Sequence, residues 1–226
     1  MRLLGGDFAD RLSDKELLEA AAGFVSLALP PRLLYDWSND ETSNEILRQA
    51  FDSFKPGHVA ILWIRHHWVT AVCTGTKEWV VLDSARSEPV RRTLNQVARI
   101  AGWSSPRTPN VRQQQAGSNE CGIFALVFAF LAARGQLSEF AGTNDPDTRE
   151  RLDLSWCRPL LLAGRFDEFF ARVTAYVTSS HAKDTRCRQN TATAGQTATS
   201  NTTVRVNNPY ATVFGLTSCL QEDTRR

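Results

Sequence analysis

Apolar positions in the first fifty residues recur at the three- and four-residue spacing of helices and are interrupted by prolines. Ser13 is a capping residue with Glu16 at the third position after it, so a helix is predicted to begin there. The tripeptide Leu29-Pro-Pro interrupts this pattern. A second helix is predicted over Ser43 to Phe54, because the helix-breaking sequence Lys55-Pro-Gly follows.

The pattern then changes to short apolar runs rich in β-branched and aromatic residues, which predict strands. The three runs are Val59–Ile64, Trp68–Cys73 and Glu78–Leu82. Between the last two, Gly75-Thr-Lys has the composition of a hairpin turn. We therefore expect antiparallel pairing in the middle of the chain.

Helical spacing returns after these strands. The segment Glu120 to Arg134 is apolar on nearly every side, which is typical of a central, buried helix. The other predicted elements are a helix over Thr93 to Trp103, a short strand over Asn110 to Gln114 and an amphipathic helix from Arg165 to Val177. Helices, antiparallel strands and further helices in this order predict an α+β fold, since a regular βαβ alternation is missing.

Length and composition predict one domain and a tail. With 226 residues, 42% of them apolar, the chain can bury one good core. We assign residues 1–178 to this domain. Residues 179–226 are polar, small and without periodicity, as in Thr-Ala-Thr-Ala-Gly-Gln-Thr-Ala-Thr-Ser, so a disordered tail is expected.

Charge and cysteine usage exclude several classes of protein. The formal net charge is +2, which argues against a nucleic-acid-binding surface. The five cysteines are widely separated and predict neither a disulfide framework nor a zinc site: Cys73, Cys121, Cys157, Cys187 and Cys219. Neither a signal peptide nor a membrane span of about 18 apolar residues is present. We expect an intracellular protein of the nucleus or cytoplasm, without a cofactor, metal or membrane partner.

One cysteine stands where a nucleophilic thiolate is expected. Cys121 follows the polar loop that starts at Gln115 and opens the apolar helix, where free backbone N–H groups stabilise negative charge. His67, at the start of a strand, is the candidate base, and Asp83, at the end of the next strand, is the candidate acid that orients it. Gln115 could donate its amide to an oxyanion together with the backbone N–H of Cys121.

Structural interpretations stand beside these roles. Cys121 on an apolar helix could be a small core residue, as most free cysteines are, and Cys73 is expected to pack in the core. His66 and His67 are neighbours that would point to opposite faces of a strand, and periodicity does not choose between them.

The acid and the oxyanion donor have alternatives too. Asp83 could cap a turn with its short side chain, which would leave Glu88 as a second candidate acid. Gln115 could be an ordinary loop amide, and Gln113 and Gln114 are equally polar neighbours.

The order of these motifs resembles that of the ubiquitin-like-protein-specific cysteine proteases, the SUMO-protease family related to the adenovirus proteinase. The matching pieces are His67-Trp68, Asp83-Ser84 and Gln115-Ala-Gly-Ser-Asn-Glu-Cys121-Gly122. The resemblance covers roughly Trp37 to Val177. It implies a papain-like architecture with a central, mostly antiparallel sheet and the nucleophile at the N-terminus of a buried helix. It also supports His67 over His66 as the base.

Substrates of that family end in Gly-Gly and pass through a narrow tunnel roofed by aromatic side chains. The resemblance assigns this substrate-binding role to Trp68 and to Trp37, although either could be a structural tryptophan of the core or the sheet margin. Ser38 and Glu120 depart from the family's usual Leu and Asp, which leaves the choice of substrate open.

The leading hypothesis is therefore a cysteine-type peptidase or isopeptidase that cleaves after the terminal Gly-Gly of a ubiquitin-like modifier, most simply a SUMO-like one, and acts as a monomer. One alternative is an acetyltransferase that uses the same residues, for which Arg86, Arg91 and Arg92 are the only basic residues close to the motifs. Another is an inactive domain that binds a ubiquitin-like protein.

Overall fold

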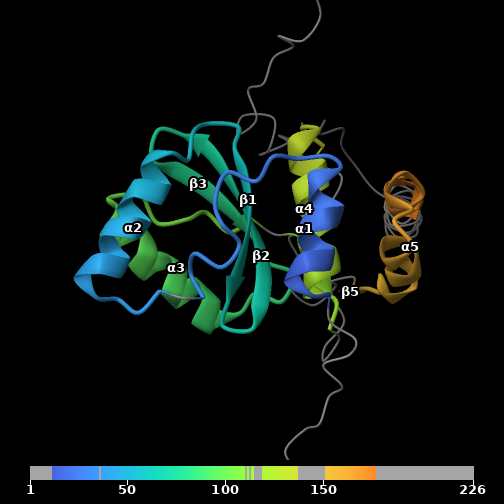
Figure 1. Cartoon of the computed structure of the whole chain (residues 1–226), viewed down its shortest axis with the longest axis horizontal. Coiled ribbons are helices and arrows are strands. Elements are labelled where there is room, and N and C mark those ends of the chain that lie inside the picture. Colours follow the sequence, from blue (N-terminus) through green and yellow to red (C-terminus); the bar gives the residue numbers. More distant parts are fainter. Residues whose placement is uncertain are drawn as a thin grey trace, which may run out of the picture.

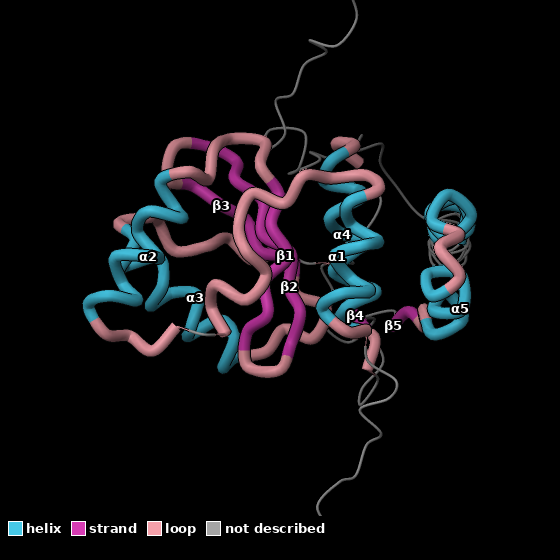
Figure 2. The backbone as a smooth tube through the Cα atoms, viewed as in Figure 1, coloured by secondary structure: helices cyan, strands magenta, loops and turns pink. Residues whose placement is uncertain are grey.

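A three-stranded antiparallel sheet with helices on both faces forms the centre of the molecule (Figures 1 and 2). The computed structural model describes residues 12–35, 37–109, 111, 113–114, 119–136 and 151–176. The strands are β1 (Val59–Ile64), β2 (His67–Gly75) and β3 (Glu78–Leu82), in the order β1-β2-β3. This arrangement confirms the predicted α+β class and the antiparallel pairing of the three apolar runs.

Tight hairpins fix the register of the sheet. Ile64 pairs with His67 at the end of the β1–β2 ladder, so Arg65 and His66 alone make the turn. Both have positive φ angles, 50° and 63°, as the two central residues of a type I′ hairpin turn require. His67 is consequently the first residue of β2.

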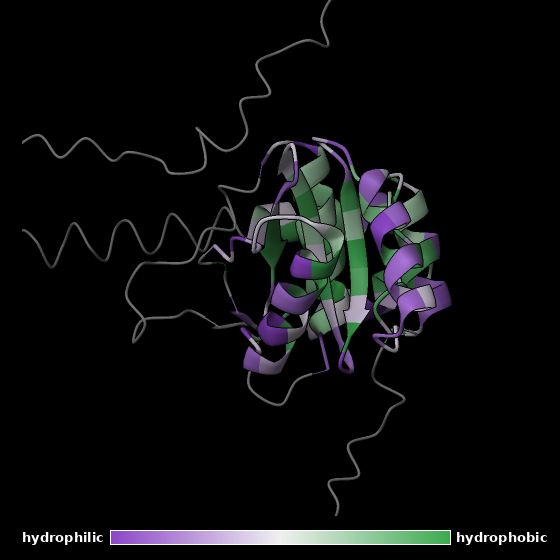
Figure 3. Ribbon diagram, turned by 90° about the vertical axis from the view of Figure 1, so that its left-hand side faces the viewer, coloured by the Kyte–Doolittle hydropathy of each residue, from purple (hydrophilic) through white to green (hydrophobic). Residues whose placement is uncertain are grey.

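Alternate residues of each strand enter two separate cores. In β1, Ile61 belongs to the core beneath α4 (Cys121–Ala133) and α1 (Asp14–Ala22), whereas Leu62 belongs to the core beneath α2 (Glu41–Asp52) and α3 (Glu88–Ala101). Figure 3 shows the strands as the hydrophobic interior of the molecule, with hydrophilic ribbon on the outer helices. Burial on both faces explains why the strand sequences show no polar alternation.

The starts of two helices differ from prediction. α1 has the predicted capping box between Ser13 and Glu16. α2 begins at Glu41, because the Asp40 side chain accepts a hydrogen bond from the Ser43 N–H at 2.8 Å. The prediction that a helix starts at Thr93 was wrong: α3 starts five residues earlier, at Glu88, with a proline in its first turn, a position that proline favours.

The last described segments pack beside α4 and α1. β4 (Gln113–Gln114) pairs in parallel with β5 (Arg151–Leu152), and η3 (Ser155–Cys157), α5 (Arg158–Leu162) and a helix over residues 166–176 follow. The Phe170 ring stacks on Phe130 of α4 with centroids 3.8 Å apart. The predicted tail, residues 179–226, lies outside the described residues. Within the described ranges, no helix is long and apolar enough to cross a bilayer.

Candidate active site

Cys121 is the first residue of α4, the helix that the sequence predicted to be buried. Every residue from Cys121 to Ala132 is buried, and Cys121 itself is 6% exposed. Because the first backbone N–H groups of a helix have no partner within the helix, they surround the thiol with hydrogen-bond donors and the positive end of the helix dipole. This position favours a thiolate.

A buried hydrogen bond holds α4 against the sheet. The Thr70 hydroxyl, in the middle of β2, donates to the Ala125 carbonyl of α4 over 2.7 Å. β2 also carries His67 as its first residue. The same strand therefore sets the position of the imidazole and of the helix that presents Cys121.

His67 contacts both of its expected partners. Its Nε2 lies 2.7 Å from Asp83 Oδ1, and its side chain also forms a hydrogen bond with the Cys121 side chain. Because Nε2 faces the carboxylate, Nδ1 is the ring nitrogen left for the thiol. The His67 and Asp83 side chains are only 12% and 10% exposed. The structure thus brings Cys121, His67 and Asp83 into one connected series.

The sheet register explains why acid and base meet. Thr70 pairs with Leu82, so continuing the β2–β3 ladder by one residue places Asp83 opposite Val69. His67 is two residues from Val69 along β2 and is therefore the diagonal neighbour of Asp83 on the same face. The sequence predicted that strand pairing would join these two side chains, and their separation agrees with it.

Backbone groups orient the Asp83 carboxylate. Its Oδ1 accepts from the Ala85 N–H and its Oδ2 from the Ser87 N–H, each at 2.8 Å. Burial acts to raise the pKa of Asp83, but the hydrogen bond and charge of His67 and these two N–H donors lower it overall. Asp83 therefore caps a turn and orients the histidine at once, although the sequence suggested these as alternatives.

His67 is held in its protonated form. Burial favours the neutral imidazole, yet the hydrogen bonds and charges of Asp83 and Cys121 outweigh burial and raise the pKa of His67 to about 9. An imidazolium beside a thiol stabilises the thiolate, and it also carries a proton that can pass to a leaving amine.

The competing residues lie elsewhere. His66 occupies the β1–β2 turn and is exposed, so the expectation that His66 and His67 point to opposite faces of a strand was wrong. Glu88 forms ion pairs with Arg91 and Arg92 at the start of α3.

The other described cysteines are in inert surroundings. Cys73 is buried in the core beneath α2 and α3, as predicted, and burial raises the pKa of its thiol. Burial, followed by the charges of Glu120 and Asp153, raises the pKa of Cys157 to about 12. Cys187 and Cys219 lie outside the described residues. Neither Cys73 nor Cys157 has an environment that favours a thiolate.

Trp68 is a core residue in this structure. It is 2% exposed, its ring lies 4.7 Å from that of Trp63, and it packs against the first turn of α4 at Gly122. Trp68 thus supports the first turn of α4. Its role in substrate binding stays a prediction.

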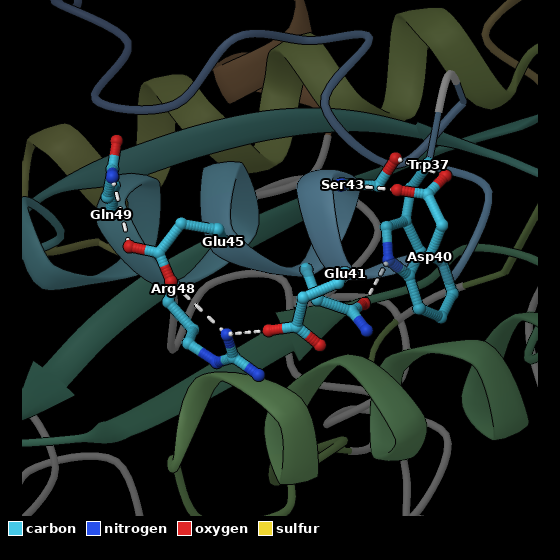
Figure 4. A network of polar contacts seen from close by, with 8 residues as sticks. Trp37, Asp40, Glu41, Ser43, Glu45, Arg48 and Gln49 are labelled. Atoms are coloured by element: carbon cyan, nitrogen blue, oxygen red, sulfur yellow. Dashed lines mark hydrogen bonds and ion pairs between the residues drawn. The ribbon is translucent and has the colours of Figure 1, made fainter.

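Trp37 packs in a different region (Figure 4). Its Nε1 donates to Asn44 Oδ1 at 2.9 Å, and its ring packs against the core beneath α2 and α3, whereas Trp68 and Cys121 belong to the other core. The structure does not bring the two tryptophans into one cluster. A shared role as the roof of a substrate tunnel stays a prediction.

Gln115, the predicted oxyanion donor, lies outside the described residues. Its neighbour Gln113, in β4, is 7% exposed, and its Nε2 has no hydrogen-bond partner within the structure as described. The assignment of Gln115 therefore stays a prediction.

A cavity of about 480 Å³ opens next to Asp83, on the side of α3. Its lining includes Arg86, Ser87 and Arg91. No group of three or more His, Cys, Asp or Glu side chains suited to a metal ion occurs in the part of the chain that the structure describes.

Comparisons with models of protein families, with curated proteins and with solved structures gave no match to this chain. The motif order and the geometry around Cys121 are therefore the features of this chain that bear on its function.

Proposed function

We propose that this protein is a cysteine-type peptidase or isopeptidase of papain-like architecture, which cleaves after the C-terminal Gly-Gly of a SUMO-like or related ubiquitin-like modifier. The observation that carries the proposal is the pair of hydrogen bonds at His67, one to Asp83 and one to Cys121 at the start of a buried helix. A solely structural histidine has no need of a thiol partner at a helix N-terminus.

Each of these residues has its own role in the proposed reaction. The Cys121 thiolate attacks the carbonyl carbon of the terminal glycine, and the backbone N–H of Cys121, with Gln115, stabilises the oxyanion. His67 gives its proton to the departing amine, which leaves a thioester on Cys121. Neutral His67 then takes a proton from water, and the hydroxide releases the glycine carboxylate. Asp83 keeps the imidazole in place during both steps.

The preference for Gly-Gly is supported by the motif series that ends in Cys121-Gly122 and by its resemblance to the ubiquitin-like-protein-specific proteases. A narrow slot near the scissile bond admits glycine alone, because every other residue has a Cβ. Which modifier is bound would be decided by surface loops.

A panel of ubiquitin-like proteins with C-terminal electrophiles tests the proposal. Ubiquitin, SUMO and further modifiers ending in Gly-Gly are incubated with the full chain, with Cys121→Ala and with Cys157→Ala as the matched control. We expect covalent capture of at least one modifier by the wild type and by Cys157→Ala, and none by Cys121→Ala. If no modifier is captured, or if Cys121→Ala still reacts, the proposal fails.

A second candidate function is acetyl transfer from coenzyme A by the same Cys121. The cavity beside Asp83, with Arg86 and Arg91 in its lining, is the observation that favours it, since phosphates need basic partners. Against it, Glu88 already forms an ion pair with Arg91. Labelling of Cys121 by radioactive acetyl-coenzyme A, without capture of any modifier, would select this reaction instead.

A further inference from the structure

Trp63, near the end of β1, is a half-buried tryptophan that the proposed reaction does not use. Its register partner across the β1–β2 ladder is Trp68. The Trp63 N–H points away from β2 and donates to the Pro31 carbonyl at 2.8 Å. The two tryptophans are therefore a non-hydrogen-bonded pair, the kind in which opposite side chains approach most closely.

Side-chain contacts connect Trp63 to both halves of the candidate site. Its ring centroid lies 4.7 Å from that of Trp68. Trp68 and Leu12 in turn pack on the first turn of α4, since Trp68 Cδ1 and Leu12 Cβ are 3.4 Å and 3.3 Å from a Cβ placed on Gly122. The Trp63 ring also meets the His66 ring edge to face, with centroids 6.2 Å apart. Trp63 thus contacts both the support of the helix start and the turn that leads into β2.

Trp63 differs from Trp68 in its access to solvent. Trp68 is 2% exposed, whereas Trp63 is only partly buried and packs at the margin of the core that contains Cys121. The indole N–H of Trp63 has no hydrogen-bond partner within the described part of the chain, whereas that of Trp37 donates to Asn44. An aromatic face and an N–H donor are therefore open to a ligand at Trp63.

The chemistry of the proposed reaction determines which part of a substrate reaches Trp63. His67 gives its proton to the departing amine, so the leaving group must lie on the side of His67, and the Gly-Gly of the modifier extends the other way from Cys121. Trp63 contacts the exposed His66, in the turn directly before His67. Trp63 is consequently placed toward the leaving group.

The surface at Trp63 suits a lysine side chain that is joined through an isopeptide bond. Such a lysine carries no charge, because its amine is part of an amide, and its methylenes are an apolar chain that packs well on an indole face. The neighbouring cation is directed elsewhere: Arg65 Nε lies 3.3 Å from Thr93 Oγ1 of α3, which packs on the opposite face of the sheet from Trp63. An uncharged, aromatic surface is thus offered to the leaving group.

We propose that Trp63 binds the leaving group and selects a lysine isopeptide over a linear peptide extension. The inference rests on the proposed function and names its substrate class, which is conjugates of the modifier rather than its precursor. The indole face packs on the lysine methylenes, and Nε1 donates to a carbonyl of the peptide that carries the lysine. This role differs from the one predicted for Trp37 and Trp68, which concerns the Gly-Gly segment.

Three reagents separate the two sides of the scissile bond. SUMO with a C-terminal vinyl sulfone, or the modifier captured in the panel above, has no leaving lysine. The same modifier is also joined to the lysine of a peptide, or extended by a linear serine-rich peptide. We expect Trp63→Ala to be captured by the probe at the wild-type rate. Its kcat/KM should fall by roughly tenfold for the isopeptide, mainly through KM, and by less than about threefold for the linear extension.

Controls exclude an effect of misfolding. Rates are expressed per molecule that the probe captures, so unfolded protein does not count. Trp63→Phe keeps an aromatic face and loses only the N–H, so it should recover most of the activity on the isopeptide. Tyr35 is also an exposed aromatic residue, but it packs beside Arg32, and Tyr35→Ala should keep all three rates.

Two results with Trp63→Ala would overturn the inference. One is an unchanged kcat/KM for the isopeptide, and the other is an equal loss with all three reagents, which would show that Trp63 does not act on the leaving group. In both cases the wild type is still captured by the probe, so the peptidase proposal stands. A wild type that is captured by no modifier overturns the proposed function itself.

Discussion

His67 joins two groups that need it for different reasons. Asp83 fixes the orientation of the ring through Nε2. The Cys121 side chain forms its hydrogen bond with the other ring nitrogen, Nδ1. Removal of either partner would lower the pKa of His67, because burial alone favours the neutral imidazole.

The pH dependence of catalysis follows from this balance. The pKa of His67 is about 9, so the proton that the leaving group needs is present below pH 9 and is lost above it. Asp83→Asn removes the stronger of the two partners that raise this pKa. We therefore expect the alkaline limb of kcat/KM to move to lower pH, and the rate at its optimum to fall by about 100-fold or more.

The pH–rate profile of a Gly-Gly reporter substrate measures this shift, and Glu88→Gln is the matched control. Glu88 is a nearby carboxylate that pairs with Arg91 and Arg92. Its variant should keep the wild-type profile. An alkaline limb that is unchanged in Asp83→Asn would contradict the assigned role of Asp83.

At the scale of single residues, the sequence predicted that three of the candidate side chains would lie together. The motif order and strand pairing indicated His67, Asp83 and Cys121, and these three meet. The choice of His67 over His66 could not come from periodicity, since the turn before it consists of Arg65 and His66. Two non-glycine residues with positive φ give none of the usual Asn-Gly signal of such turns. Leu12 carried no signal either, because it contacts Gly122 only through the tertiary fold.

Among the elements, β2 contributes most to the geometry of the candidate site. It supplies His67 at its first residue and holds α4 through the buried bond from Thr70 to the Ala125 carbonyl. A shift of α4 along β2 would move Cys121 relative to the imidazole. The placement of the Cys121 thiol beside the His67 imidazole thus depends on the contact between β2 and α4.

Thr70→Val tests that contact. Valine has nearly the same shape but donates no hydrogen bond, so we expect a loss of about 1–2 kcal/mol in the free energy of unfolding. We also expect kcat to fall by roughly tenfold, because small displacements of reacting groups lower the rate of the chemical step. Denaturant titration and the reporter assay measure the two effects.

Thr74→Val is the matched control in the same strand. Its hydroxyl is 3.5 Å from Arg107 Nη2 and has no contact with α4 among the contacts described above. This variant should keep both stability and kcat close to the wild-type values. A Thr70→Val enzyme with unchanged kcat would show that α4 is positioned by other contacts.

Elements were predicted well where both faces of a strand or helix are apolar, as in β1 and α4. α3 was predicted short because Glu88, Pro89, Arg91 and Arg92 are polar or helix-breaking in isolation. Pro89 at the first turn was the available signal, since proline is favoured there and unfavourable further along.

At the scale of the whole molecule, the sheet separates two cores, and we expect them to differ in how much they affect activity. The core beneath α2 and α3 contains Phe51, which contacts the rings of Trp79 and Trp103 edge to face. The core on the opposite face contains Cys121 and Phe124. We expect the first core to contribute stability without touching the reaction.

Alanine substitutions in the two cores measure this difference. Phe51→Ala and Phe124→Ala each remove a ring that is 0% exposed, so each should cost about 3–5 kcal/mol in the free energy of unfolding. Activity per folded molecule should stay near wild type in Phe51→Ala. It should fall at least about tenfold in Phe124→Ala, since that ring lies in the first turn of α4 and supports the alignment on which the rate depends. Equal activity losses would contradict the separation.

The short hairpin between His67 and Asp83 has a consequence for the order of events during synthesis. These two residues are separated by sixteen positions and are joined by adjacent strands, so their pairing requires only local chain closure, which is fast. Cys121 arrives later, on a helix that must dock across the finished hairpin. In a chain growing on the ribosome, we therefore expect His67 and Asp83 to pair before Cys121 joins them, so that the proposed activity would begin only when α4 is in place.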